Sequence, residues 1–280
     1  MTRRIDAHHH LWTAGSDRHP MLDGPPVERF WGNSAELVRD YPVDIFAAQA
    51  RATGVVASVY VEAGFAPADE EARVVQAIAK THGFPHAILT RIDLADPDAG
   101  ARIAADAACA NWRGIRVTAP APFDDPQWRR GLAALSAAGG VADLMVWPGQ
   151  LDAVAALARA MPDAAIVIEH LGMADGDPLW AAGMAALADC GNVSVKLSGA
   201  GLVRRDWSAD TVRPVIARLL ALFGAERLMW GSNAPVDLVM ADYPTIVARF
   251  DDALADRSAA ERRAIWHDTA ERVYRIGAVA

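Results

Sequence analysis

The sequence predicts an α/β fold, a (β/α)₈ TIM barrel of eight parallel strands that forms a single domain over residues 1–280. Three observations support this prediction. Eight short apolar runs alternate with longer stretches of helical period. The chain length is close to the roughly 250 residues of a typical barrel. Repeated alternation of strand and helix also forces parallel neighbours through right-handed crossovers.

The expected strands are short apolar runs that end at turn residues or polar side chains. Strand–helix units in this number close into a barrel more readily than they form an open sheet. A doubly wound open sheet is the alternative, but no G-x-G-x-x-G motif follows any early strand. The predicted strands are Ile5–His8, Val55–Glu62, Ala87–Asp93, Gly114–Thr118, Val141–Val146, Ala165–His170, Val193–Ser198 and Leu228–Ser232.

The stretches between the strands have apolar residues at helical spacing and capping signals at their ends. Asp125 is followed by Pro126, which places a capping residue before a proline in the first turn of a helix. A long irregular loop, residues 13–33, follows the first strand on the side where barrel active sites lie. The predicted helices include Ser34–Thr53, Asp69–His82, Asp125–Ala138, Leu151–Met161, Leu179–Cys190, Asp210–Phe223, Tyr243–Ala255 and Ala259–Tyr274.

Composition and charge exclude several classes of partner. The net charge is -8 and no lysine- or arginine-rich block occurs, whereas nucleic acids and anionic membranes require a basic face. No apolar run approaches the roughly 18 residues of a membrane span, and no apolar signal segment precedes the first strand. Cys109 and Cys190 lack a C-x-x-C spacing. We therefore expect a cytoplasmic protein, and a homo-oligomer is one of the states that the sequence allows.

Three consecutive histidines end the first predicted strand. Because side chains alternate along a strand, His8 and His10 should point the same way and His9 the opposite way. If this pair faces the barrel axis, two imidazoles converge where a metal ion or a substrate binds. Histidines that only form hydrogen bonds at a strand end are the alternative. His170 ends the sixth predicted strand and should reach the same end of the barrel.

The seventh predicted strand alternates polar and apolar side chains. Ser194, Lys196 and Ser198 share one face, and the apolar face should meet the helices, so Lys196 should point into the barrel. A buried cation without a partner is costly. Lys196 is therefore expected to form an ion pair inside the barrel, for instance with Glu62, or to bind an anionic ligand.

Other polar side chains near strand ends are candidates for substrate binding. The alternation argument favours inward positions for Arg116 on the fourth strand and for Arg91 and Asp93 on the third. If these cations are free, the site selects a small anionic molecule that carries a carboxylate. Tryptophans near strand ends either pack in the barrel wall or flank a substrate ring. The candidate substrate-binding residues are Arg116, Glu62, Ser198, Trp12 and Trp147.

Six segments match the sequence pattern of a known family, in barrel order and over nearly the whole chain. They are Ile5–Trp12 (IDAHHHLW), Gly114–Arg116 (GIR), Val167–Gly172 (VIEHLG), Val193–Gly199 (VSVKLSG), Leu228–Val236 (LMWGSNAPV) and Asp268–Tyr274 (DTAERVY). With them the chain resembles the amidohydrolase-related family within the amidohydrolase superfamily of TIM-barrel hydrolases. The closest likeness is to the branch that holds sugar-acid lactonases and 2-pyrone-4,6-dicarboxylate lactonase.

The resemblance implies that His8, His10 and His170 bind one divalent metal ion, zinc or manganese, or polarise the substrate without a metal. It also implies an aspartate on the eighth strand as general base, but this sequence has Asn233 there. An amide cannot take up a proton at neutral pH. The base would then be a metal-bound hydroxide, since zinc-like ions lower the pKa of water to about 7, or a neighbouring carboxylate. The candidate carboxylates are Asp237, Glu62 and Glu169.

The resemblance implies a hydrolase that opens a lactone or cyclic ester of a small carboxylated molecule, sugar-acid or pyrone-like. The histidines would polarise the carbonyl group, and Lys196 and Arg116 would hold the carboxylate or the developing oxyanion. Two alternatives remain. One is a metal-dependent decarboxylase or hydratase of the same superfamily. The other is a small-molecule binder that lost catalysis when Asn233 replaced the aspartate.

Overall fold

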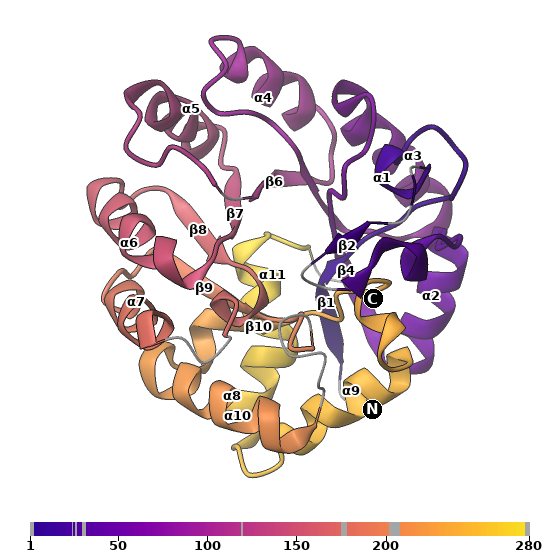
Figure 1. Ribbon diagram of the computed structural model, residues 1–280, viewed down its shortest axis with the longest axis vertical. Coiled ribbons are helices and arrows are strands. Elements are labelled where there is room, and N and C mark those ends of the chain that lie inside the picture. Colours follow the sequence, from indigo (N-terminus) through magenta and orange to yellow (C-terminus); the bar gives the residue numbers. More distant parts are fainter. Residues whose placement is uncertain are drawn as a thin grey trace.

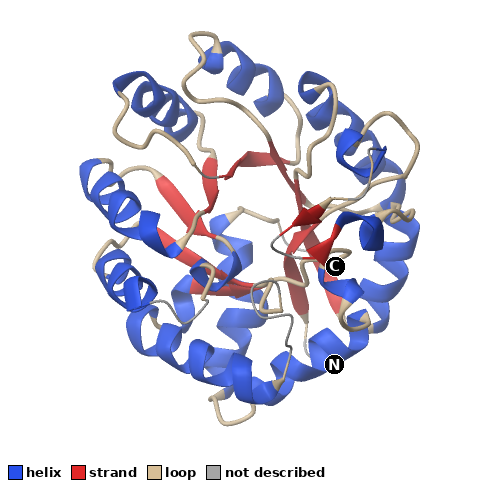
Figure 2. Cartoon of the chain, viewed as in Figure 1, coloured by secondary structure: helices blue, strands red, loops and turns tan. Residues whose placement is uncertain are grey.

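Eight parallel strands form one sheet in the order β1-β4-β5-β6-β7-β8-β9-β10. The computed structural model describes residues 3–23, 25, 27–29, 32–118, 120–174, 178–201 and 208–277. A ring of helices surrounds the strands, as Figures 1 and 2 show. The predicted TIM barrel is therefore confirmed.

Each barrel strand corresponds to a predicted one, although several end early. Strands β5, β8 and β10 end before the polar residues that were expected as their last residues. These polar residues do not pair with a neighbouring strand and belong to the loops at the carboxyl end of the barrel. The strand bounds are β1 Arg4–His9, β4 Val55–Val61, β5 Ala87–Thr90, β6 Trp112–Thr118, β7 Val141–Met145, β8 Ala165–Ile168, β9 Val193–Leu197 and β10 Leu228–Trp230.

Two predicted helices are interrupted. The expected helix Ser34–Thr53 is a 3₁₀ turn, Ser34–Leu37, followed by α2 (Val43–Ala52), because Pro42 fixes its own φ and caps the second segment. The expected helix Ala259–Tyr274 contains a π-helical turn, Ala264–Asp268. The other helices are α3 Glu71–His82, α4 Ala99–Ala107, α5 Pro126–Ala137, α6 Leu151–Ala160, α7 Pro178–Ala188, α8 Ala209–Phe223, α9 Tyr243–Ala253, α10 Ala259–Arg263 and α11 Thr269–Val273.

The loop after β1 is less irregular than predicted. It contains the short helix α1 (Pro20–Asp23) and a two-stranded hairpin of β2 (Glu28–Arg29) and β3 (Gly32–Asn33). Short 3₁₀ turns also follow several strands, among them η3 (Pro148–Gln150), η4 (His170–Gly172) and η6 (Asp237–Val239). Within the described ranges, no helix is both long and apolar enough to cross a membrane.

The barrel interior is apolar at the end where the strands begin. Ile5, Val59 and Met229 pack there with Ala270 of α11 and with Tyr274 just after it. Figure 1 shows α11 inside the ring formed by the other helices. This helix therefore closes one end of the barrel and leaves the carboxyl ends of the strands for a site.

The barrel closes between the end of β1 and the segment that follows β10. His9 and Ala234 form an isolated parallel bridge. The backbone N–H of Asn233 donates to the carbonyl of His8 at 2.8 Å, and the N–H of His10 donates to that of Ala234 at 2.8 Å. The closure of the barrel therefore uses the residues that the sequence singles out as functional.

Candidate active site

Strand β1 carries one extra residue next to the histidines. Asp6 lies opposite Ser58 of β4 but His9 lies opposite Tyr60, so three steps along β1 match two along β4. Ala7, within this irregularity, packs in the inner core of the barrel. Because a β-bulge resets the alternation of side chains, the residue after Ala7 can face inward as well.

The bulge directs His8 and His10 into the barrel. Their Nε2 atoms are 3.3 Å apart, and the rings of His8 and His170 have centroids 4.6 Å apart. His9 points outward and stacks on Phe46 of α2, with ring centroids 3.7 Å apart. The three histidines named from the sequence as site residues thus meet in one buried cluster, while His9 belongs to the layer between sheet and helices.

His170 reaches the cluster through an unusual backbone conformation. Its φ is 54° and that of Leu171 is 58°, values that are rare outside glycine and concentrate at functional sites. Ser198, expected from the sequence to contact substrate, is fully buried, and its Oγ lies 3.0 Å from Nδ1 of His170. Ser198 therefore orients the His170 ring from behind.

Lys196 points into the barrel, but its partner is Asp143 and not Glu62. The ammonium and the Asp143 carboxylate form an ion pair between two fully buried side chains. Burial raises the pKa of the Asp143 carboxyl, and the ammonium opposes this shift. Tyr274 also donates a hydrogen bond to Asp143 at 2.9 Å. Because Lys196 Nζ lies 3.4 Å from Nδ1 of His8, Lys196 can act on the site through His8.

Sequence reasoning did not find Asp143 as a site residue. The signal was present, because Asp143 is the one charged residue in the apolar run Val141–Val146 and lies at an inward position of it. The sequence marks Glu169 only as a candidate base. Its role as the partner of the buried Arg116 depends on how far apart the two side chains lie in the barrel, and a single sequence does not give that distance.

The hydrogen bonds of the cluster determine where its protons lie. Nδ1 of His10 is 2.8 Å from the carbonyl of Val61 and must donate to it, so its Nε2 is an acceptor. An ammonium can only donate, so Nδ1 of His8 accepts from Lys196 and Nε2 of His8 carries the hydrogen. That hydrogen then points to Nε2 of His10. Oε1 of Glu169, 3.6 Å from Nδ1 of His8, is an acceptor for the other tautomer.

The three imidazoles are neutral at neutral pH. Burial lowers the pKa of His8 and of His170 well below the ordinary value, and lowers that of His10 to about 3. The nearby positive charges of Lys196 and Arg116 lower these pKa values further. Neutral imidazoles can ligate a metal or donate a hydrogen bond, but such weakly basic rings are poor proton acceptors.

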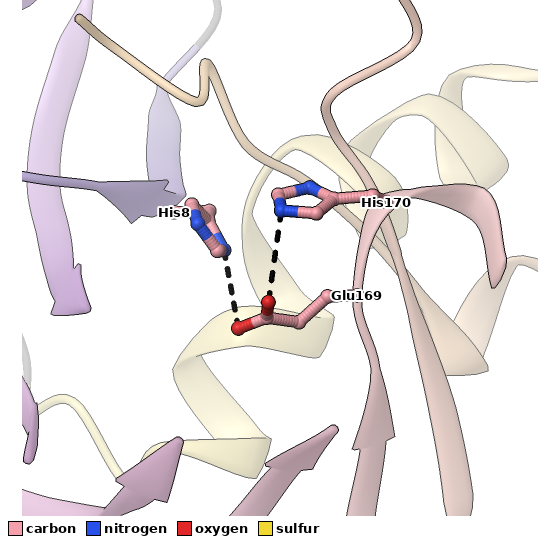
Figure 3. Close-up of side chains that lie close together, drawn as sticks. All are labelled: His8, Glu169 and His170. Atoms are coloured by element: carbon pink, nitrogen blue, oxygen red, sulfur yellow. Dashed lines mark ion pairs between the residues drawn. The ribbon is translucent and has the colours of Figure 1, made fainter. Parts of the chain in front are cut away.

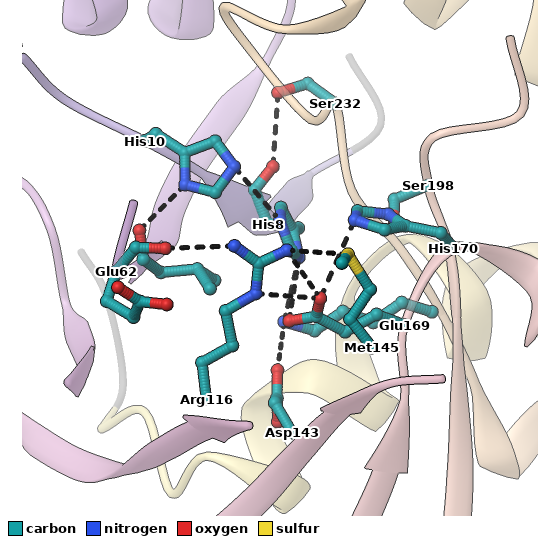
Figure 4. A network of polar contacts seen from close by, with 12 residues as sticks. His8, His10, Glu62, Arg116, Asp143, Met145, Glu169, His170, Ser198 and Ser232 are labelled. Carbon is teal, nitrogen blue, oxygen red and sulfur yellow. Dashed lines mark hydrogen bonds and ion pairs between the residues drawn. The ribbon is translucent and has the colours of Figure 1, made fainter. Parts of the chain in front are cut away.

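Arg116 lies at the centre of the polar network in Figure 4. Its Nε and Nη2 contact Oε2 of Glu169 at 3.0 and 2.9 Å, its Nη1 donates to the carbonyl of Glu62 at 3.1 Å, and Nη2 lies 3.3 Å from Sδ of Met145. These contacts leave one Nη1–H of the guanidinium for a ligand. Burial raises the pKa of the Glu169 carboxyl, and Arg116 opposes this shift.

A cavity of about 220 Å³ lies over the cluster. The Trp12 ring, which lines it, is nearly parallel to the His10 ring, at 15° and with centroids 6.1 Å apart. Trp147, expected to flank a substrate, is half-buried at the start of η3 and is not among the described residues that line this cavity. The polar residues that line it are His10, Glu62, Arg116, Thr118, His170 and Asn233.

Asn233 stands at the rim of β10 with a φ of 55°. Its Nδ2 donates to Oδ1 of Asp237 at 2.9 Å, and its side chain also forms a hydrogen bond with His10. Because Nε2 of His10 is an acceptor, the second hydrogen of the Asn233 Nδ2 is the one that can donate to it. Burial raises the pKa of Asp237 to about 8, and this residue is fully buried, so it orients the amide and does not reach the cavity.

Comparison with known proteins places this site in a family. The chain belongs to the amidohydrolase family, whose model matches residues 5–276. It is 31% identical to the L-fucono-1,5-lactonase of Burkholderia multivorans over 301 residues, 98% of this chain and 96% of that one. The crystal structure of an amidohydrolase from Burkholderia multivorans with bound zinc gives a TM-score of 0.85 at 29% identity, covering 98% of this chain and 99% of that one.

A candidate 2-pyrone-4,6-dicarboxylic acid hydrolase from Pseudomonas putida also has the same fold. Its crystal structure gives a TM-score of 0.77 at 25% sequence identity and covers 99% of both chains. The family match, the lactonase relative and this structure agree with the likeness noted in the sequence.

The buried donors fit a divalent metal ion. His8, Glu169 and His170 each offer a ligand atom, and these atoms lie within 4.8 Å of one another. Figure 3 shows the Glu169 carboxylate facing both imidazole rings. Oε1 of Glu169 has no hydrogen-bond partner among the residues that the structure describes. Imidazole and carboxylate are both common zinc ligands. His10, the other ligand named from the sequence, presents its Nε2 to His8 at the edge of this group.

Proposed function

We propose that this protein is a hydrolase that opens a lactone, or a similar cyclic ester, of a small molecule that carries a carboxylate. The observation that supports this function is the convergence of neutral imidazoles and the Arg116 guanidinium on one cavity. Donors fixed around such a cavity stabilise the negative charge that develops on a carbonyl oxygen during ester hydrolysis. Membership of the amidohydrolase family and the name of the lactonase relative agree with this chemistry.

The reaction consumes one water molecule. The water oxygen bonds to the carbonyl carbon, the ring C–O bond breaks, the ring oxygen takes up a proton, and a hydroxy acid leaves. Of the three carboxylates considered as base, Glu62 lines the cavity, whereas Glu169 and Asp237 are fully buried. Glu62 therefore removes the proton from water, and the amide oxygen of Asn233 accepts a hydrogen bond that orients the water.

A divalent ion such as zinc or manganese, held by His8, Glu169 and His170, would supply Lewis-acid polarisation of the carbonyl when bound. Other residues of the site bind and orient the substrate whether or not the ion is bound. Arg116 offers its remaining N–H to the substrate carboxylate, and Trp12 covers one side of the ring. Lys196 holds its charge behind His8 and keeps the cluster neutral.

The test is a panel of sugar-acid lactones that includes L-fucono-1,5-lactone, assayed by acid release. We expect Glu62→Gln to lower kcat by about 100-fold, because the amide cannot take the proton. Glu70→Gln makes the same chemical change outside the site, where Glu70 pairs with Arg18, and should leave kcat unchanged. Lack of hydrolysis by the unaltered protein, with activity only in Asn233→Asp, would overturn the proposal in favour of a binding protein.

A further inference from the structure

The cavity over the histidines adjoins a larger one beyond the ends of β5 and β6. The inner cavity measures about 220 Å³ and the outer one about 850 Å³. Glu62, Gly64 and Arg116 line both, so the two cavities adjoin at these residues. Since a cavity of about 150 Å³ holds benzene, the inner cavity has room for one small ring. The outer cavity is left for a part of the substrate that does not react.

The outer cavity has apolar walls. Ile92, Leu94 and Trp128 line it and are almost completely buried. Asp93 also lines it, and the carboxylate of Asp93 accepts a hydrogen bond from the backbone N–H of Ala95 at 2.9 Å. Apolar walls of this kind favour an alkyl or aryl group over a second sugar ring.

Arg91 brings a positive charge to this cavity. It follows β5 two positions after the inward-facing Leu89, so its side chain lies on the cavity side and is exposed. Within the described ranges, the guanidinium forms no ion pair with Asp93 or any other carboxylate. The backbone N–H of Arg91 donates to Oε2 of Glu71 at 3.4 Å.

The Glu71 carboxyl does not neutralise Arg91. Glu71 is fully buried, and burial raises its pKa to about 8, so it is largely protonated at neutral pH. The charge of Arg91 therefore remains available to a ligand in the outer cavity. Arginine recognises carboxylate, sulfonate and phosphate groups by charge-assisted hydrogen bonds.

We propose that the substrate has two parts: a reactive ring in the inner cavity, and an apolar tail that ends in an anionic group bound by Arg91. This inference rests on the proposed function, because the ring is opened in the inner cavity. Arg91 then determines specificity at the far end of the tail, away from the ester bond that breaks. It selects anionic tails over neutral ones of the same length.

Two lactones that share a ring and a tail length test this inference. N-succinyl-L-homoserine lactone ends in a carboxylate where N-butyryl-L-homoserine lactone ends in a methyl group. We expect the unaltered protein to show a kcat/KM about 10-fold higher for the succinyl lactone. Arg91→Gln should bring the ratio to about 1 by lowering kcat/KM for the succinyl lactone, and Arg91→Glu should invert it.

Matched variants separate this effect from general changes in charge or folding. Arg73→Gln removes an exposed positive charge from the outer face of α3 and should keep the ratio of the unaltered protein. Arg91→Lys keeps the charge and should keep part of the preference. An unchanged ratio in Arg91→Gln would overturn the inference.

The inference and the proposed function can fail separately. If the unaltered protein opens neither lactone, the catalytic proposal fails for this ring. Calorimetric titration of the two lactones then still measures binding. Preferential binding of the succinyl lactone that disappears in Arg91→Gln supports the two-part ligand, whereas absence of a preference, or of any binding, overturns it.

Discussion

Three residues around the histidine cluster adopt left-handed backbone although none of them is glycine. His170, Leu171 and Asn233 have φ values of 54°, 58° and 55°. Each such residue costs on the order of 1–3 kcal/mol and persists only where its surroundings hold it. Here Trp180 donates to the carbonyl of Leu171 at 2.8 Å, and Asp237 holds the side chain of Asn233. The site geometry therefore depends on buried hydrogen bonds that no sequence period reveals.

Asp237 should make the stability of the protein depend on pH. Burial raises its pKa to about 8 in the folded chain, against about 3.9 when unfolded. The folded state therefore binds this proton more tightly, so the contribution to stability is complete below about pH 4 and is lost as the pH rises through about 8. In the unaltered protein, the free energy of unfolding should therefore fall by up to ~1.4 kcal/mol per pH unit as the pH rises through this window. We expect Asp237→Asn to abolish this dependence on pH.

Urea unfolding at several pH values between about 5 and 8 measures this slope. Asp152→Asn, at an exposed position of α6, is the matched control and should leave the slope of the unaltered protein in place. A slope that Asp237→Asn does not reduce would show that this carboxyl is already ionised in the folded protein.

At the scale of elements, strand alternation predicts the barrel well and the site only in part. It places Lys196 inside, because the polar residues of β9 share a face. It also puts His8 and His10 on one face. Because Ala7 faces the barrel interior, strict alternation would turn both of these histidines outward. The bulge against β4 reverses this orientation. Such an irregularity depends on pairing between strands, as does the choice of Asp143 as the partner of Lys196, so neither follows from a local pattern.

Close packing between α5 and the loop after β5 leaves no room for a side chain at Gly131. A Cβ at Gly131 would lie 2.2 Å from the carbonyl oxygen of Leu94, whereas one at Gly100 in α4 would meet nothing within 4 Å. Gly131→Ala should therefore destabilise the protein by about 1–3 kcal/mol. Gly100→Ala should stabilise it by about 0.5–1 kcal/mol, because alanine favours the helix and restricts the unfolded chain.

Thermal or urea unfolding of the two alanine variants checks this pair. Both glycines lie inside helices, so the gain in helix propensity is shared and the difference reports the backbone contact. Equal effects on stability would mean that α5 can move away from Leu94 at no cost.

At the scale of the whole molecule, the barrel interior is divided between an apolar end and a charged end. Tyr274 closes the apolar end, and its hydroxyl reaches Asp143, so the two ends are joined through one hydrogen bond. The charged end contains the pairs Lys196–Asp143 and Arg116–Glu169. Buried ion pairs contribute little to stability once desolvation is counted. Their presence beside neutral imidazoles is therefore better explained by the chemistry of the site than by folding.

A zinc ion that binds this site should stabilise the folded chain as a whole. His8 lies on β1, and Glu169 and His170 follow β8, so the ion would join distant parts of the barrel. An ion that binds only the folded chain stabilises it by ~2.7 kcal/mol at a hundred times its Kd. We expect zinc to raise the Tm of chelator-treated protein, and Glu169→Gln to reduce this increment by removing the anionic ligand.

The increment in Tm is the quantity to compare, because Glu169→Gln also removes the partner of Arg116 and lowers the Tm without zinc. A second group of potential ligands, His267, Asp268 and Glu271, lies half-buried in the closing helical segment and could bind zinc as well. His267→Ala is therefore the matched control and should keep the full increment. An increment that is lost in His267→Ala but kept in Glu169→Gln would locate the ion in that segment and leave the barrel histidines to act without it.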